Sequence, residues 1–235
     1  MSSPTSAPSS TGSPSTAIMS AYVDAATRQA GPQGERMAEL LDRIIARPRE
    51  HARFLNTLSR MEYVGVRKML KSRQSERLDC EGLQHMLDET IHALRLKKAA
   101  LALAAGARTV ETYAAHDTLA GDAGEAYLQE VDHAAEATLG DIPDASRAEI
   151  NYLLSSAAIE VRAQAFYPLY EERLRAAGVT VSVAAIMRDE DRHLADMAER
   201  LEATLPGWRP RLEAVLDAES RLFAAFAAAI SARLG

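Results

Sequence analysis

The stretches DETIH at residues 88–92 and DEDRH at residues 189–193 decide the expected fold of this 235-residue chain. Both follow the pattern D-E-x-x-H, and both lie in segments rich in helix-forming residues. Positions three residues apart on an α-helix share one face, so each glutamate and histidine can offer two donor atoms to one metal site. Two such pairs, together with single glutamates from two other helices, form the ligand set of a dinuclear metal site in a four-helix bundle.

Chance explains a third, incomplete copy of this pattern. Glu130 and His133 also form E-x-x-H, but Gln129 stands where the other two copies have aspartate. In a chain of this composition, roughly 0.5 E-x-x-H motifs are expected by chance. Two chance copies of the longer D-E-x-x-H motif are very improbable. We therefore interpret Glu130 and His133 as part of a polar helix face, and the two complete copies as a site.

Composition favours an all-α protein. Hydrophobic residues make up 47% of the chain but aromatic residues only 5%, and strand-favouring runs are nearly absent. The single cysteine, Cys80, excludes a disulfide framework and a cysteine-rich iron or zinc domain within this chain. No apolar run approaches the length of a membrane span, and the N-terminal stretch lacks the features of a secretory signal. We expect a soluble, cytoplasmic protein.

The chain divides into a tail and one helical domain. Residues 1–33 are rich in serine, proline and alanine and are expected to form a disordered tail and linker. Residues 34–235 are expected to form the helical domain, with the metal-binding bundle at about 49–204. The apolar periodicity predicts helices at about 35–46, 49–73, 76–104, 123–138, 144–175, 182–205 and 211–234.

Two isolated glutamates lie on apolar helix faces. Glu62 is in phase with Leu58 and Met69, and Glu160 is in phase with Ala157. A carboxylate within an apolar stripe needs a partner, because burial of an unpaired charge is costly. Each half of the chain thus supplies one isolated glutamate and one D-E-x-x-H. The predicted metal ligands are Glu62, Glu89, His92, Glu160, Glu190 and His193.

The order E, D-E-x-x-H, E, D-E-x-x-H resembles the ferritin-like di-iron carboxylate superfamily, which includes bacterioferritin, rubrerythrin and the small subunit of ribonucleotide reductase. The resemblance covers residues 49–204 and implies a ferritin-like four-helix bundle with a crossover connection, to which this chain adds N- and C-terminal helices. It also implies a role for each ligand. Glu62 and Glu160 would be terminal carboxylates, Glu89 and Glu190 bridging carboxylates, and His92 and His193 the nitrogen ligands.

The aspartate before each bridging glutamate also has a role in this resemblance. It accepts a hydrogen bond from the histidine of the opposite pair and so fixes the tautomer of that histidine. We therefore expect Asp189 to hold His92, and Asp88 to hold His193. The chain departs from rubrerythrin in lacking a cysteine-rich iron domain and in having Ala163 where rubrerythrin has an additional glutamate.

Four carboxylates and two imidazoles favour iron or manganese over zinc or copper. The resemblance implies two iron ions, with manganese as an alternative, and O2 as co-substrate. We expect an oxygen-activating di-iron oxidoreductase that acts on a small molecule and takes electrons from an external ferredoxin or reductase. One alternative is a ferroxidase or iron-storage protein, and another is a manganese or peroxide-handling oxidoreductase. An oxygenase should have a cavity that reaches the metals.

Three further residues are candidates for the substrate pocket. His85 lies one turn before Glu89 on the same face, where a hydrogen-bonded core histidine is the alternative. Gln164 and Tyr167 follow Glu160 by one and two turns, and either line the pocket or pack in the core.

The sequence contains few features that indicate binding partners. A basic cluster formed by Arg67, Lys68, Lys71 and Arg73 either complements the end of its helix or docks an acidic electron donor. RNA is a third option, although no alternation of aromatic and basic residues supports it. We expect a monomer or homodimer, in which the Ala-rich segment 211–234 covers the bundle or forms a dimer contact.

Overall fold

The computed structural model describes residues 32–72, 78–104 and 110–235, and the regular secondary structure within these ranges is helical. This confirms the all-α prediction. The expected tail falls almost wholly on residues outside the described ranges, and its last two positions, 32 and 33, belong to the first described helix. The helices are α2 (Pro32–Ile45), α3 (Pro48–Ser72), α4 (Cys80–Leu103), α5 (Gly121–Glu136), α6 (Asp144–Ala176), α7 (Ala184–Thr204) and α8 (Trp208–Leu234).

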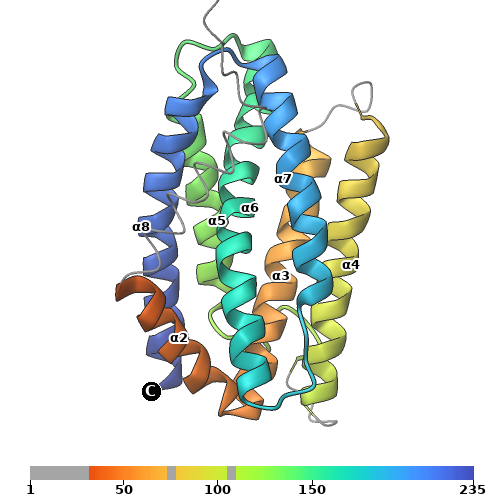
Figure 1. The fold of residues 1–235 in the computed structure, drawn as a ribbon, viewed down its shortest axis with the longest axis vertical. Helices are drawn as coiled ribbons and strands as arrows, with labels where there is room; N and C mark the ends of the chain where they lie inside the picture. The colour runs from red at the N-terminus through yellow and green to blue at the C-terminus, as the bar shows by residue number, and fades with distance from the viewer. Residues whose placement is uncertain (1–31, 73–77, 105–109) are drawn as a thin grey trace, which may run out of the picture.

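Two helical hairpins form the centre of the bundle. α3 packs along α4, and α6 packs along α7, while contacts of α3 with α6 and of α4 with α7 join the hairpins. The chain direction in Figure 1 shows that α4 and α6 run the same way, so the connection through α5 returns along the length of the bundle. The long connection predicted between the two hairpins is thus present and carries a helix of its own.

The remaining helices form a second layer on one side of these hairpins. α8 packs against α5 and α6, and α2 contacts α3, α6 and α8 near the C-terminus (Figure 1). The last helix therefore covers the bundle, which was one of the two roles expected for it. None of the helices in the described ranges is both long and apolar enough to cross a membrane.

Helix ends follow local signals. Asp79 caps α4 through a 2.8 Å hydrogen bond from the backbone N–H of Gly82, so this helix begins later than residue 76. After α6, Gly178 adopts a φ of +67°, and the N–H of Val179 donates to the carbonyl of Leu174. Glycine adopts this left-handed conformation without steric cost, which explains why α6 stops there. α6 itself continues through Pro168.

A buried ion pair fastens the second layer to the hairpins. Glu219 of α8 accepts hydrogen bonds of 2.8 and 2.7 Å from the guanidinium of Arg162 on α6. It also accepts one of 2.6 Å from the hydroxyl of Tyr127 on α5. Both charged residues are at least nine-tenths buried, and the guanidinium lies 4.2 Å from the ring centre of Phe223. One carboxylate thus joins three helices.

Replacement of Glu219 by alanine should lower the free energy of unfolding by about 3–5 kcal/mol, because it leaves Arg162 as an unpaired buried charge. Urea unfolding followed by circular dichroism measures this change. Glu130→Ala is the matched control, since the Glu130 side chain is 58% exposed on α5. It should change stability by no more than about 1 kcal/mol. Equal effects of the two substitutions would contradict the role given to the buried pair.

Candidate metal centre

The six predicted ligands come from α3, α4, α6 and α7 and meet inside the bundle. Their donor atoms, together with one from His85, fall into two groups. Within each group, the donor atoms all lie within 4.8 Å of one another. We call the two groups the His92 group and the His193 group. The His92 group consists of Glu62, Glu89, His92 and Glu190; the His193 group consists of His85, Glu89, Glu160 and His193.

The donor distances in the His92 group suit a bound ion. Nδ1 of His92 lies 3.4 Å from Oε1 of Glu190 and 3.9 Å from Oε2 of Glu62. Two donors that each lie about 2.1 Å from an ion are about 3.0 Å apart when adjacent and about 4.2 Å apart when opposite. The observed separations fall within that range, so one ion can contact all these atoms.

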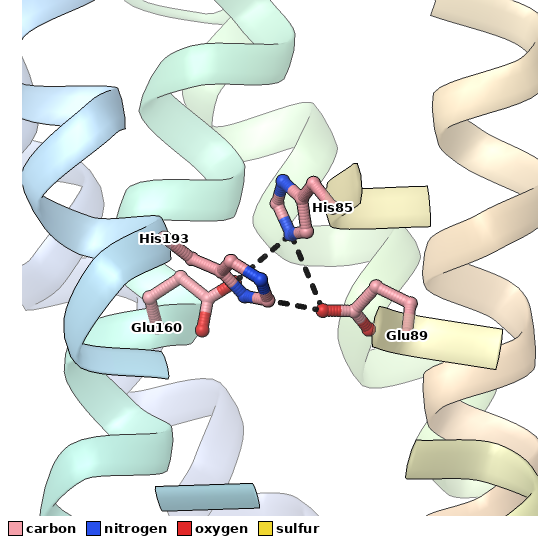
Figure 2. Close-up of side chains that lie close together, drawn as sticks. All are labelled: His85, Glu89, Glu160 and His193. Atoms are coloured by element: carbon pink, nitrogen blue, oxygen red, sulfur yellow. Dashed lines mark hydrogen bonds and ion pairs between the residues drawn. The ribbon is translucent and has the colours of Figure 1, made fainter. Parts of the chain in front are cut away.

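The His193 group has similar spacing (Figure 2). Nδ1 of His193 lies 3.7 Å from Oε1 of Glu89 and 3.8 Å from Oε1 of Glu160. Nε2 of His85 lies 3.2 and 3.6 Å from the same two oxygens. This group therefore presents two imidazole nitrogens and two carboxylate oxygens to one point.

Two glutamates connect the groups. Glu89 belongs to both. Glu190 directs Oε1 toward Nδ1 of His92 at 3.4 Å and Oε2 toward Nδ1 of His193 at 3.5 Å. Glu62 and Glu160 each belong to one group only. This arrangement agrees with the bridging and terminal roles that the family resemblance implies.

Unsatisfied polar atoms show that the residues fit metal ions. In the described part of the chain, Nδ1 of His92, Nδ1 of His193 and Oε2 of Glu190 are buried and lack a hydrogen-bond partner. Buried polar atoms in folded proteins are almost always paired. All three atoms belong to residues of the two groups, and a cation placed between them would supply the partner that each lacks. The buried His and Glu residues thus form a site that can hold metal.

The outer nitrogen of each histidine is held by an aspartate from the opposite pair. Nε2 of His92 lies 3.1 Å from Oδ2 of Asp189, and Nε2 of His193 lies 3.3 Å from Oδ2 of Asp88. These are the crossed pairs expected from the resemblance. Burial raises the pKa of Asp88, but hydrogen bonds with Gln84 and His193 and the charge of Arg192 bring it below its usual value. A carboxylate at this position accepts the Nε2 proton, which would leave Nδ1 free to bind a metal.

Replacement of Asp88 or Asp189 by alanine should weaken metal affinity by about 10–100-fold without unfolding the bundle. Anaerobic titration with Co(II), combined with thermal melting, separates the two effects. Asp191→Ala serves as a control on α7, because Asp191 hydrogen bonds to Gln164 and not to a ligand histidine. Unchanged affinity in both Asp88→Ala and Asp189→Ala would show that the aspartates do not support the site.

The four glutamates are under electrostatic strain while no cation is bound. Burial, together with the charges of neighbouring carboxylates, raises the pKa of Glu62, Glu89 and Glu160 to about 8. Burial, followed by the charge of Glu160, also raises the pKa of Glu190 well above its usual value. Metal-free protein therefore holds protons at this centre near neutral pH.

This proton binding predicts how the stability of the metal-free protein depends on pH. Between a pKa of 4.5 in the unfolded chain and about 8 in the folded one, the folded state binds more protons. The free energy of unfolding should therefore decrease as pH rises through that interval. Bound metal should remove the decrease, because cations replace the protons. Urea unfolding at several pH values, with and without Mn(II), measures both effects, and Glu160→Gln should flatten the metal-free profile. A metal-free profile that rises with pH would contradict the assignment.

The three residues expected at the pocket have different surroundings. Tyr167 donates a 2.5 Å hydrogen bond to Oε1 of Glu62 and lines a cavity beside the centre. Gln164 instead donates to Asp191 at 2.9 Å and does not line that cavity. His85 lines the same cavity, is buried and hydrogen-bonded as a core histidine would be, and also lies within the His193 group. The sequence feature that pointed to His85 as a site residue was its position one turn before Glu89, but that position suits a core residue equally well.

A cavity of about 490 Å³ adjoins the centre. Its wall includes His85 and four of the predicted ligands: Glu62, Glu89, Glu160 and Glu190. Gly65 leaves room beside Glu89, because a Cβ there would lie 3.3 Å from Oε2 of Glu89. Most of the wall is apolar, and much of it comes from α2, α5 and α8. Apolar wall residues include Met37, Leu40, Ile44, Phe54, Leu58, Leu128, Ile159, Phe166, Phe223, Phe226 and Ile230.

Two groups of charged residues lie outside the donor groups, although Arg67, Lys68 and Lys71 of the second group line the cavity. Glu130 and His133 form a 3.5 Å pair with both side chains more than half exposed, in agreement with their interpretation as a polar helix face. In the basic cluster, Arg67 pairs with Glu125 at 3.2 Å and Lys68 with Asp132 at 2.5 Å. Its last member, Arg73, lies outside the described residues. Neighbouring carboxylates thus neutralise part of this cluster.

Comparison with known proteins identifies no relative: no protein-family model, curated protein or solved structure matches this chain. The function must be inferred from the site and its cavity.

Proposed function

We propose that this chain is a ferritin-like di-iron protein that uses O2 to oxidise an apolar small molecule. The cavity beside the four carboxylates carries this proposal. Its volume lies within the range of about 300–1,000 Å³ that is common for small-molecule sites. A protein that only oxidises or stores iron needs no space for an organic ligand. An apolar chamber that ends at the donor atoms suits a substrate positioned for oxidation.

Iron is the metal that this chemistry requires. When bound, a pair of ferrous ions supplies the electrons and the O2 reactivity that amino-acid side chains lack. Glu62, Glu89, Glu160 and Glu190 would balance the charge of two divalent ions, with imidazole nitrogens completing the donor set. Carboxylate-rich sets of this kind favour iron or manganese.

The residues around the donor set have separate tasks. Asp88 and Asp189 fix the orientation of His193 and His92, so Nδ1 faces the ions. The hydroxyl of Tyr167 holds a proton against Oε1 of Glu62 at the cavity wall. The apolar part of the wall would hold an apolar substrate next to the carboxylates. Repeated turnover needs electrons from an external donor of the ferredoxin or reductase type, and we place this activity in a monomer or homodimer in the cytoplasm.

Addition of Fe(II) in large excess under air distinguishes this proposal from iron storage. We expect rapid oxidation of about two Fe(II) per chain, followed by arrest until a reductant is supplied. Stopped-flow absorption and O2 consumption follow the reaction, and light scattering gives the oligomeric state. Sustained oxidation of many ions per chain in a high-mass assembly would favour storage. Activity with Mn(II) and peroxide, but not with Fe(II) and O2, would favour the manganese alternative.

Partial filling of the cavity should abolish substrate oxidation while metal binding persists. Ala163 lines the cavity, whereas the equally half-buried Ala165 on the same helix does not. A panel of apolar aliphatic and aromatic compounds, with isotopically labelled O2 and mass spectrometry, should yield labelled products with the wild type and Ala165→Phe. Ala163→Phe should bind two metal ions but yield at least about tenfold less product. Equal yields from both variants would show that the cavity does not hold the substrate.

A further inference from the structure

We propose that His85 is a third imidazole ligand of the metal centre, bound to the ion of the His193 group. This inference rests on the proposed dinuclear centre and adds a donor that the D-E-x-x-H pattern does not contain. The family resemblance gives each metal one histidine. The geometry gives the His193 group two and leaves the His92 group with one.

The position of the ring carries the proposal. Nε2 of His85 lies 3.2 Å from Oε1 of Glu89 and 3.6 Å from Oε1 of Glu160. Nδ1 of His193 faces the same two oxygens at 3.7 and 3.8 Å. The two nitrogens therefore converge on one point between two carboxylates, as Figure 2 shows. The contact with Glu89 is a hydrogen bond in the metal-free structure, but the second oxygen, from Glu160, and the convergence with Nδ1 of His193 are what a shared ion would require.

Neighbouring rings hold His85 in that orientation. The hydroxyl of Tyr152 lies 3.3 Å from Nδ1 of His85, and Tyr152 is only 2% exposed. The His85 ring also stacks on that of His193, with ring centres 3.9 Å apart and planes inclined by 30°. If Nδ1 carries the proton and donates it to the Tyr152 oxygen, Nε2 keeps its lone pair for a metal.

The partner on the outer nitrogen distinguishes His85 from the other two histidines. His92 and His193 are held by carboxylates, which increase the basicity of a ligating imidazole. His85 is held by a neutral hydroxyl and should be the weakest of the three nitrogen ligands. The centre is then asymmetric, with two imidazoles on one ion and one on the other.

A second, smaller pocket reaches His85 from another side. It has a volume of about 250 Å³, and His193, Gln84 and Asp196 contribute to its wall. His85 is the residue shared by this pocket and the large cavity in the described part of the chain. Removal of its side chain should therefore leave a space that free imidazole can enter, which provides a test by chemical rescue.

Co(II) is a suitable probe, because it binds without O2 chemistry and shifts the proton resonances of its ligands. Each imidazole bound to Co(II) gives one exchangeable N–H signal outside the normal NMR range. Wild-type protein loaded anaerobically should show three such signals, His85→Gln two, and the control His51→Gln three. His51 is also a buried histidine, but its ring bonds to Tyr170 and is remote from the donor groups.

Affinity provides the second measurement. We expect His85→Gln to weaken one of two Co(II) binding steps by at least about tenfold, and free imidazole to restore that step in His85→Ala. Thermal melting confirms that each variant is folded. Two shifted N–H signals in the Co(II)-loaded wild type would overturn the proposal, even if neither variant folds. Two binding steps of unchanged affinity in folded His85→Gln would also overturn it, and both results leave the dinuclear centre intact. A wild type that binds no Co(II) would instead refute the proposed function itself.

Discussion

Four carboxylates placed together in an apolar interior are the constraint on which the rest of this molecule depends. Burial alone raises the pKa of each, and mutual repulsion adds to the effect. Such a cluster is stable only with bound cations or with bound protons. The packing of the surrounding helices must withstand the remaining repulsion between the carboxylates. The orphaned nitrogens of His92 and His193 are directed at the same place as the carboxylates. Cations satisfy both requirements together, because they balance the carboxylate charges and bind the lone pairs of both nitrogens.

Much of this centre could be predicted from the sequence, because helix geometry is local. Three residues of spacing place Glu89 and His92 on one face, and the same holds for Glu190 and His193. The phase of Glu62 within an apolar stripe indicated burial without any knowledge of its neighbours. The crossed aspartates followed from the resemblance, and the observed hydrogen bonds have the same pairing. In each case the residues that support the prediction lie within a short segment of the sequence.

The cavity and the role of His85 could not be predicted in this way, because they depend on packing between distant segments. The cavity exists because α2, α5 and α8 form a second layer, and no periodicity within one helix indicates the space left between layers. Glu219 lies in the Ala-rich last helix and had no assigned role from the sequence, but it is 2% exposed and paired with Arg162. His85 occupies a position equally suited to a core residue, and its function depends on Glu160 and His193 from two other helices.

The two layers of helices have different roles in the proposed enzyme. Helices α3, α4, α6 and α7 supply the donor atoms, so they determine which metals bind and which class of chemistry is available. Helices α2, α5 and α8 supply much of the apolar wall, so they determine which molecules reach the donors. Because the Arg162–Glu219 pair anchors α8 to α6 just beyond Glu160, the wall is fixed to the same helix that carries a ligand. Under the proposed function, we therefore expect substitutions along the inner face of α8 to change substrate choice without moving a donor atom, and loss of Glu219 to affect both.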